Sequence, residues 1–206
     1  ANTIGGTSAA DRNVITGSAA GLSISGDGTV IQGNFVGLAA SGVAAIPSGT
    51  GIAWGGSGGS IGGSAAGAGN VISGNTFGLL INGGGAVLVL GNRIGTDAGG
   101  TLPIGNTDLG VHVIQATGVT IGGLDPGEAN LIAFNGVDGG VVVRDNATGV
   151  RIRGNSIHAN AGLGIDLVAF NPLLPTPTGP GRRLTAPTRT PTHPDPPPLR
   201  TPPPPP

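Results

Sequence analysis

Residues Gly140 to Ile157 read GVVVRDNATGVRIRGNSI, and this stretch contains one complete unit of a repeating pattern. It has three short apolar runs separated by two pairs of corner residues: Val141–Val143, Val150–Ile152 and Ile157, with Asp145-Asn146 and Gly154-Asn155 between them. β-Branched residues bounded by Asn, Asp and Gly are typical of strands joined by tight turns. The stretch therefore predicts three short strands and two corners.

The same unit recurs along the chain. The triplet Ile-Gly-Gly begins at Ile4, Ile61 and Ile121, which are 57 and 60 residues apart. Within this period, a glycine followed by an apolar-x-apolar triplet recurs every 24 to 32 residues, at Gly21, Gly51, Gly78, Gly110, Gly140 and Gly164. A unit of this size cannot bury its apolar side chains alone, so the period indicates a stacked repeat protein.

Alternate residues of a strand point to opposite sides, which separates core positions from surface positions. In the first strand of each unit, the residues predicted to face inward are Leu22, Ile24, Ile52, Trp54, Leu79, Ile81, Val111, Val113, Val141, Val143, Ile165 and Leu167. In the second and third strands they are Ile4, Ile31, Ile61, Val89, Ile121 and Ile152, and Ile15, Val36, Ile72, Ile94, Ile132 and Ile157. The intervening first-strand residues are expected to face outward: Ser23, Ala53, Leu80, His112, Val142 and Asp166.

An asparagine precedes every third strand, at Asn13, Asn34, Asn70, Asn92, Asn130 and Asn155. Stacked amides bond to one another and to corner carbonyls, which satisfies the polar groups of a tight corner. Together these features predict an all-β fold, a parallel β-helix with three strands per turn and about five and a half turns over residues 1–170. The turns are expected to stack roughly 4.8 Å apart.

The remaining parts of the chain are the loops between the predicted strands and a C-terminal tail of different composition. Short loops are predicted at residues 7–12, 64–69 and 124–129, and longer ones at 38–50 and 96–109. Residues 171–206 are rich in Pro, Thr and Arg, which predicts a disordered or polyproline II tail, either a linker or an abnormal terminus.

The chain has 43 glycines, no cysteine and a formal net charge of −1. The absence of cysteine excludes disulfides and thiolate metal sites, and the charge does not favour nucleic acid. No apolar run approaches the roughly 18 residues that a membrane span requires.

Three phrases carry a resemblance to a known architecture: NTIGGT at residues 2–7, NVISGN at 70–75 and GNRIGTDAGGT at 91–101. With them the chain resembles right-handed parallel β-helix repeat segments of large bacterial secreted and surface proteins, an architecture of the pectin-lyase-like superfamily. The resemblance implies an extracellular or cell-surface location and contact with polysaccharide. Relatives of this architecture include pectate lyases, polygalacturonases, phage tailspikes and non-catalytic adhesins, so it does not choose between enzyme and scaffold.

Charged residues gather near the C-terminal end of the repeats: Arg144, Asp145, Arg151, Arg153, His158 and Asp166. Arginine suits carboxylate or sulfate, so Arg144, Asp145, Arg151 and Arg153 are the predicted ligand-binding set for an anionic glycan. If the protein is an enzyme, Arg151, Arg153, His158 and Asp166 are the best catalytic candidates. The alternative interpretation is that these charges keep the protein soluble and protect the open end of the coil.

Other candidates have structural explanations beside the functional ones. Asp97 and Asp108 flank one long loop and are a weak candidate pair for Ca²⁺, although Asp at a glycine-rich corner usually serves the turn. Trp54 is a common sugar-stacking residue type, yet its register predicts a core position. Six apolar residues are expected to face outward and suggest a lateral partner, self-association or a covering segment: Val30, Phe35, Val71, Leu80, Leu88 and Leu90.

Two functions remain open from the sequence. The first is a non-catalytic scaffold or binding segment that contacts polysaccharide, and the second is a lyase or glycoside hydrolase acting on an anionic glycan. Hydrolysis requires two carboxyl groups about 5–9.5 Å apart, and on the first strands only Asp166 supplies one. Ice or mineral binding is a third, weaker possibility, because the outward series Val30, Ser60, Leu88, Thr120 and Arg151 is irregular.

Overall fold

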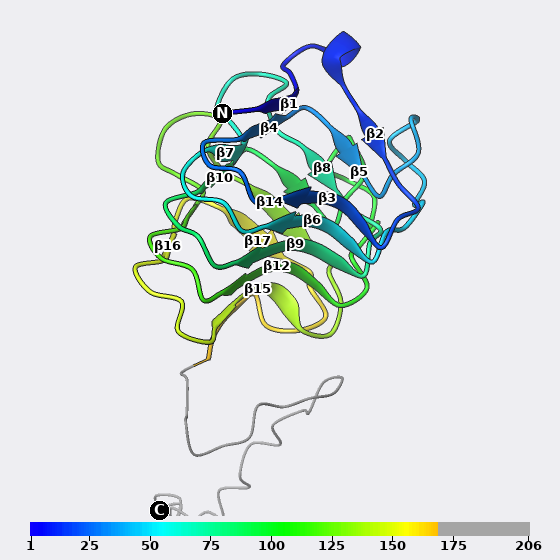
Figure 1. Cartoon of the computed structure of the whole chain (residues 1–206). Helices are drawn as coiled ribbons and strands as arrows, with labels where there is room; N and C mark the ends of the chain where they lie inside the picture. Colours follow the sequence, from blue (N-terminus) through cyan, green and yellow to red (C-terminus); the bar gives the residue numbers. More distant parts are fainter. Residues whose placement is uncertain (169–206) are drawn as a thin grey trace, which may run out of the picture. The chain divides into compact units, whose positions relative to one another are not determined.

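The computed structural model describes residues 1–168 and shows a parallel β-helix in which each turn contributes one strand to each of three sheets (Figure 1). All three sheets are parallel and six-stranded, so the described residues form six turns, slightly more than expected. The predicted all-β, three-strand repeat is confirmed. The Pro-rich tail predicted at 171–206 lies outside the described residues.

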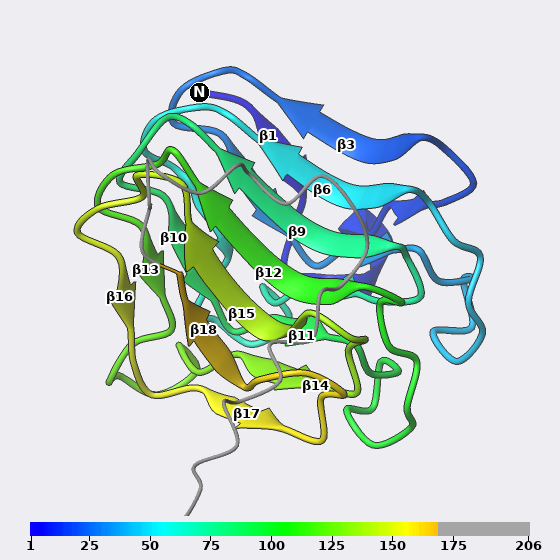
Figure 2. The same cartoon turned by 90° about the horizontal axis from the view of Figure 1, so that it is seen from below.

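The strands follow the three predicted runs of each unit. Sheet A contains β1 (Thr3–Gly5), β4 (Val30–Gln32), β7 (Ser60–Gly62), β10 (Leu88–Leu90), β13 (Thr120–Ile121) and β16 (Arg151–Ile152). Sheet B contains β2 (Val14–Ile15), β5 (Phe35–Val36), β8 (Val71–Ile72), β11 (Arg93–Ile94), β14 (Leu131–Ala133) and β17 (Ser156–His158). Sheet C contains β3 (Ala20–Ile24), β6 (Thr50–Trp54), β9 (Phe77–Asn82), β12 (Leu109–Ile114), β15 (Gly139–Arg144) and β18 (Ile165–Leu167), which Figure 2 shows side by side. A short 3₁₀ turn, η1 (Ala9–Asp11), lies in the first loop.

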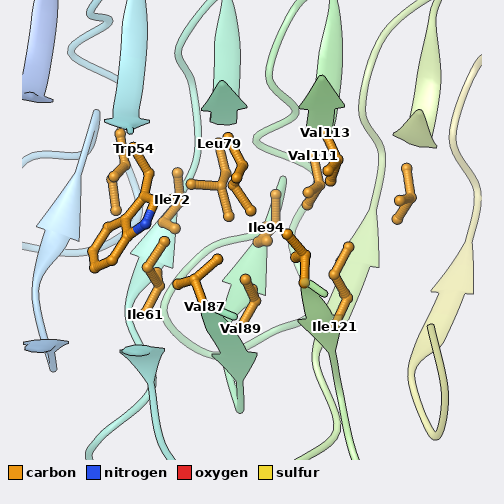
Figure 3. Packing of buried hydrophobic residues seen from close by; sticks show 14 of the residues in the cluster. Trp54, Ile61, Ile72, Leu79, Val87, Val89, Ile94, Val111, Val113 and Ile121 are labelled. Carbon is orange, nitrogen blue, oxygen red and sulfur yellow. The ribbon is translucent and has the colours of Figure 1, made fainter. Parts of the chain in front are cut away.

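The core lies inside the coil and contains most of the predicted inward residues. Ile165 and Leu167 were also predicted to face inward, but they are 45% and 70% exposed in the last turn. Ile31, Ile61, Val89 and Ile121 occupy equivalent positions of sheet A in successive turns and are fully buried. Figure 3 shows how their neighbours from the three sheets pack together. Trp54 belongs to this core, as predicted, and its Nε1 donates a hydrogen bond to the Gly56 carbonyl at 2.9 Å.

The glycine at the start of each of the first five sheet C strands is required by close approach between turns. A Cβ atom at Gly51, Gly78 or Gly110 would lie 2.5–2.7 Å from a carbonyl oxygen of the next turn. It would also lie 2.7–2.9 Å from an asparagine amide nitrogen. Any larger residue would therefore push adjacent turns apart, which explains the recurrence of glycine in the sequence.

The predicted asparagine ladder forms at the corner between sheets A and B, and we call it ladder 1. Its members are Asn13, Asn34, Asn70, Asn92, Asn130 and Asn155. At each step the Nδ2 group donates to Oδ1 of the asparagine in the following turn at 2.8–3.0 Å. The backbone N–H groups donate to the same oxygens at 2.9–3.1 Å.

A second ladder, which was not predicted from the sequence, forms at the corner between sheets B and C. Ladder 2 consists of Ser18, Ser48, Asn75, Asn106, Asn135 and Asn160. The asparagine side chains are linked at 2.9–3.2 Å. Asn75, Asn135 and Asn160 each follow a ladder 1 asparagine by five residues, which is the signal that was available in the sequence.

The two long loops, residues 38–50 and 96–109, cover part of sheet B. The Ala98 N–H donates to the Gly42 carbonyl at 2.9 Å, which joins the loops. Beneath them Phe35 and Val71 are 5% and 2% exposed and pack with Leu38 in a second apolar cluster. The expectation that these two residues belong to an exposed apolar strip is therefore wrong, because the chain itself supplies the covering segment.

Two further residues expected at the surface are buried. His112 and Val142, on the outer side of sheet C, are only 6% and 4% exposed. In the strand register His112 stands between Leu80 and Val142, whose side chains flank it on neighbouring turns. The alternation of sides was predicted correctly, but the degree of burial on the outer side was not.

Leu88, by contrast, is 41% exposed, and Val30, Leu80 and Leu90 are half-buried.

Within residues 1–168 there is no helix with the length and apolar character of a membrane span.

Candidate functional site

The charged residues predicted to form one site are distributed over the three sheets of the last turn. Arg151 lies in β16 of sheet A and Arg153 follows it, whereas His158 ends β17 of sheet B. Asp166 lies in β18 of sheet C and pairs with Val142. Outward side chains of three different sheets point in different directions, so the structure does not bring the four catalytic candidates together. The imidazole of His158 instead makes an edge contact with Phe134, with 6.0 Å between ring centroids.

Arg144 and Asp145 do lie together, at the end of β15. Their Nε and Oδ2 atoms are 3.6 Å apart. Asp145 and Asn146 have φ angles of 55° and 66°, the left-handed conformation that Asp and Asn adopt more readily than most residues. This corner therefore turns the chain sharply and leaves Arg144 beside it.

The Arg144 side chain borders an open hollow at the C-terminal end of sheet C. The hollow has a volume of about 520 Å³ and lies between the end of β15, the corner at residues 146–150 and the end of β18. Apolar walls come from Val143, Val150 and Leu167. The Arg144 Nε is buried, yet it makes no hydrogen bond with any residue of the described part of the chain. Its contact with the Asp145 Oδ2 at 3.6 Å is longer than a hydrogen bond, and a buried donor without a hydrogen bond is unfavourable.

His112 is the second buried polar group without a partner. Its Nε2 makes no hydrogen bond to residues 1–168. Burial, together with the positive charge of Arg144, lowers the pKa of His112 to about 4, while Asp145 opposes this shift. The imidazole is therefore neutral at physiological pH and does not act there as a cation.

Asp108 and Asp138 form an acidic pair that was not predicted from the sequence. They occupy equivalent positions on neighbouring turns, each two residues before a sheet C glycine. The Asp138 N–H donates to the Asp108 carbonyl at 3.1 Å. Burial raises the pKa of Asp108, and the charge of Asp138 raises it further, whereas Arg144 acts in the opposite direction. Each aspartate lies two residues before its glycine, Gly110 or Gly140, and this shared position could have predicted from the sequence that the two residues are neighbours.

Asp97 serves its own loop. Its Oδ1 accepts hydrogen bonds from the N–H groups of Thr101 and Leu102 at 2.7 and 2.8 Å. The bond from Leu102 is the main reason that the pKa of Asp97 is below its ordinary value. Among residues 1–168 no three His, Asp or Glu side chains are grouped as a metal site would require. Calcium binding by Asp97 and Asp108 stays a prediction.

The geometry defines the class of protein as a parallel β-helix repeat protein, with a hollow at the end of sheet C and two buried polar atoms nearby that make no hydrogen bond to residues 1–168. No protein-family model, curated protein or solved structure matches the chain.

Proposed function

We propose that the chain is a non-catalytic β-helical binding segment that contacts an anionic polysaccharide through Arg144 and the adjoining hollow. The observation that carries this proposal is the buried Nε of Arg144, which lacks a hydrogen-bond acceptor among the described residues. A guanidinium offers several N–H groups in a planar arrangement that matches a carboxylate or sulfate. The Arg144 side chain is 37% exposed, so the carboxylate of a uronate or the sulfate of a sulfated sugar can accept hydrogen bonds from its other guanidinium N–H groups.

The walls of the hollow also suit a sugar. Val143, Val150 and Leu167 offer apolar surface to the C–H groups of a pyranose ring, while Asn146 and Arg144 are polar groups at the same place. Ligand sites commonly combine apolar walls with a few polar groups that fix orientation. Two hydrogen-bonded ladders hold the surrounding turns, so the site is expected to be rigid before a ligand binds.

The cellular setting is part of the same proposal. The resemblance of residues 2–7, 70–75 and 91–101 to bacterial β-helical repeats supports a place in a secreted or cell-surface protein of the pectin-lyase-like architecture. An extracellular β-helix would meet polysaccharide there, which agrees with the chemistry of the hollow. No cofactor is needed for binding of this kind.

The test is a glycan array with the full chain, followed by titration with a polyuronate oligosaccharide and its neutral counterpart. Arg144→Gln removes the cation while retaining a polar side chain, and we expect at least a tenfold loss of affinity for the uronate. Arg151→Gln is the matched comparison on sheet A, and it should bind as the unaltered protein does. Equal affinity of the Arg144 variant would refute the proposal, and a selective loss in the Arg151 variant would move the site to sheet A.

One observation favours a second function, an enzyme that acts on an anionic glycan. Asp108 and Asp138 place two carboxyl groups close together on neighbouring turns, and the pKa of Asp108 is raised, as an acid catalyst requires. The release of reducing ends from uronate polymers would support this alternative if Asp108→Asn abolishes it. New absorbance from double bonds would indicate a lyase instead. A protein that binds but releases neither product is the scaffold that we propose.

A further inference from the structure

The two long loops begin with the same hairpin, repeated two turns apart. Hairpin 1 consists of residues 38–45 and hairpin 2 of residues 96–103, and in each the first and last residues form an antiparallel bridge. The equivalent glycines Gly42 and Gly100 have φ angles of 72° and 79°, in the left-handed region that glycine adopts readily. The coil therefore presents two copies of one surface, which can be compared residue by residue.

The residues beneath the two hairpins differ in chemistry. A Cβ atom at Gly42 would lie 3.0 Å from the Phe35 ring, which places hairpin 1 over an aromatic side chain. A Cβ atom at Gly100 would lie 3.2 Å from the Arg93 Nε, which places hairpin 2 over a cation. Phe35 and Arg93 pair with Val71 from its two sides, so both stand in the same outward column of sheet B. Arginine thus occupies the position that phenylalanine holds two turns earlier.

An open pocket of about 330 Å³ lies beside hairpin 2. It is lined by Arg93 and Leu131 on sheet B, by residues 99–100 of the hairpin, and by Gly127 and Ala129 at the corner before β14. The strands beneath it, β11 and β14, are each paired with strands on both sides. The pocket therefore belongs to the interior turns of the coil and not to either end.

The equivalent space beside hairpin 1 is filled, because hairpin 2 covers it. A Cβ atom at Gly42 would lie only 2.7 Å from the Ala98 Cβ. Two turns after hairpin 2, residues 159–164 join β17 to β18 by a short connection without a hairpin. No segment of residues 1–168 equivalent to Ala98 therefore covers the later site, and Arg93 and Leu131 remain half-buried.

Arg12 provides a contrast, because it lies near the same sheet and has its partners within the coil. Its guanidinium lies 4.0 Å from the centre of the Phe35 ring, and its Nε donates to the Gly33 carbonyl at 3.0 Å. The Arg93 side chain makes neither an ion pair nor a hydrogen bond with any other residue in the described part of the chain. An arginine that borders a pocket and lacks internal partners can give all of its N–H groups to a ligand.

We propose that this pocket binds one acidic sugar through Arg93. The planar guanidinium donates two parallel hydrogen bonds to the carboxylate. Leu131 and Ala129 offer apolar surface to the C–H groups of the ring, while the glycine backbone of hairpin 2 permits close approach and supplies polar groups for the hydroxyls. A volume of about 330 Å³ is at the small end of ligand sites, roughly 300–1,000 Å³, which suits a single ring better than a longer segment.

The test is a titration of the isotope-labelled full chain with glucuronate, followed by NMR. The pocket lies on sheet B and the hollow beside Arg144 at the end of sheet C, so this inference does not depend on the function proposed above. We expect saturable shifts of the amide signals of Gly99, Gly100 and Gly127, both in the unaltered chain and in the Arg144→Gln variant. Glucose lacks the carboxylate and should leave these signals in place. Equal affinity for sulfate and glucuronate would overturn the assignment to a sugar.

Three variants identify the residue responsible. Arg93→Gln removes the cation and should weaken glucuronate binding by about tenfold or more. Arg93→Phe places the residue type of Phe35 in the pocket and should abolish binding. Arg12→Gln is the matched control and should bind as the unaltered protein does, because the partners of Arg12 lie within the chain.

Circular dichroism would first establish that each variant retains its β-structure. Unchanged affinity in the Arg93→Gln variant, or equal losses in the Arg93→Gln and Arg12→Gln variants, would overturn the proposal. Shifts confined to residues that line the hollow of sheet C would also overturn it, while leaving the proposed function intact.

Discussion

Two regions of this β-helix bury polar side chains, and they differ in how completely those side chains are paired. In ladder 1, the carboxamide of Asn92 accepts two hydrogen bonds from Asn70 and donates to Asn130 and to the Ile61 carbonyl. On the outer side of sheet C, the Nε2 of His112 and the Nε of Arg144 are buried without a hydrogen bond to residues 1–168, although the Arg144 Nε lies 3.6 Å from the Asp145 Oδ2. Burial alone does not distinguish the two regions.

The difference shows which polar residues maintain the fold and which are available for another role. A fully paired buried network stabilises a unique arrangement, whereas an unpaired buried donor raises the free energy of the free protein. We therefore assign the ladders to the architecture and the end of sheet C to recognition. The following substitutions test this distinction.

The largest effect is expected from Asn92→Ala in ladder 1. This change leaves the Asn70 N–H and the Ile61 carbonyl buried without their partners, which should lower the free energy of unfolding by about 3 kcal/mol. Urea unfolding followed by circular dichroism measures the loss. Asn82→Ala is the control, because Asn82 is exposed at the end of β9 and belongs to neither ladder. Similar losses in both variants would show that ladder 1 contributes little.

A somewhat smaller loss is expected from Asn106→Ala in ladder 2. Asn106 accepts from the Asn75 N–H at 3.1 Å and donates to the Ile72 carbonyl at 3.1 Å, slightly longer than the corresponding bonds of Asn92. The free energy of unfolding should fall by about 2 kcal/mol. The same urea experiment measures it, and a loss below about 0.5 kcal/mol would mean that ladder 2 is not a structural network.

His112 should make stability depend on pH between about 4 and 6.5. Its pKa is about 4 in the folded chain and near 6.5 when unfolded, so the unfolded chain binds more protons in this range. Stability is then complete above pH 6.5 and declines as the pH falls toward 4, by on the order of 2 kcal/mol. His112→Leu places the residue type of Leu80 at this position and should flatten the profile. Thermal unfolding at pH 7 and pH 5 compares the two proteins, and parallel profiles would contradict the assignment.

The smallest effect is expected from Asp108→Asn. The pKa of Asp108 is raised, so its charged form is disfavoured in the folded chain at pH 7. Removing this charge should increase the free energy of unfolding by less than about 1 kcal/mol, because the pair is partly solvated. The gain should disappear as the pH falls toward 3.8, the ordinary pKa of aspartate, because the raised pKa of Asp108 lets the folded protein become protonated first. A lower urea midpoint for the variant at pH 7 would indicate that Asp108 has an attractive partner instead.

Much of the architecture follows from local patterns in the sequence. Period-two alternation around Val111 and Val113 determines which side chains face the core, and the recurring glycines permit the close approach of successive turns. The first ladder was predictable because each asparagine immediately precedes a strand. The second was missed because loops at residues 38–50 and 96–109 interrupt its spacing, although Asn75 and Asn135 kept a constant offset from ladder 1.

The site was less predictable, for a geometric reason. Arg151, His158 and Asp166 are close in sequence, but each lies on a different sheet, since the chain turns through two corners between them. Conversely, Asp108 and Asp138 are 30 residues apart and meet because one turn of the coil separates them. Proximity in a solenoid depends on position within the turn more than on distance along the chain.

The sequence by itself determined the repeat, the three-strand turn, the inward residues and the first ladder, because these depend on short-range alternation and on residues that only a tight corner tolerates. Tertiary structure decided which outward residues are covered, as for Phe35 beneath the long loops, and which buried polar atoms make no hydrogen bond to the described residues, as for the Nε of Arg144. Those outcomes depend on where loops and neighbouring turns lie in space. The positions of the loops and turns depend on many weak contacts between residues that are distant in the sequence, so they cannot be predicted from a local sequence pattern.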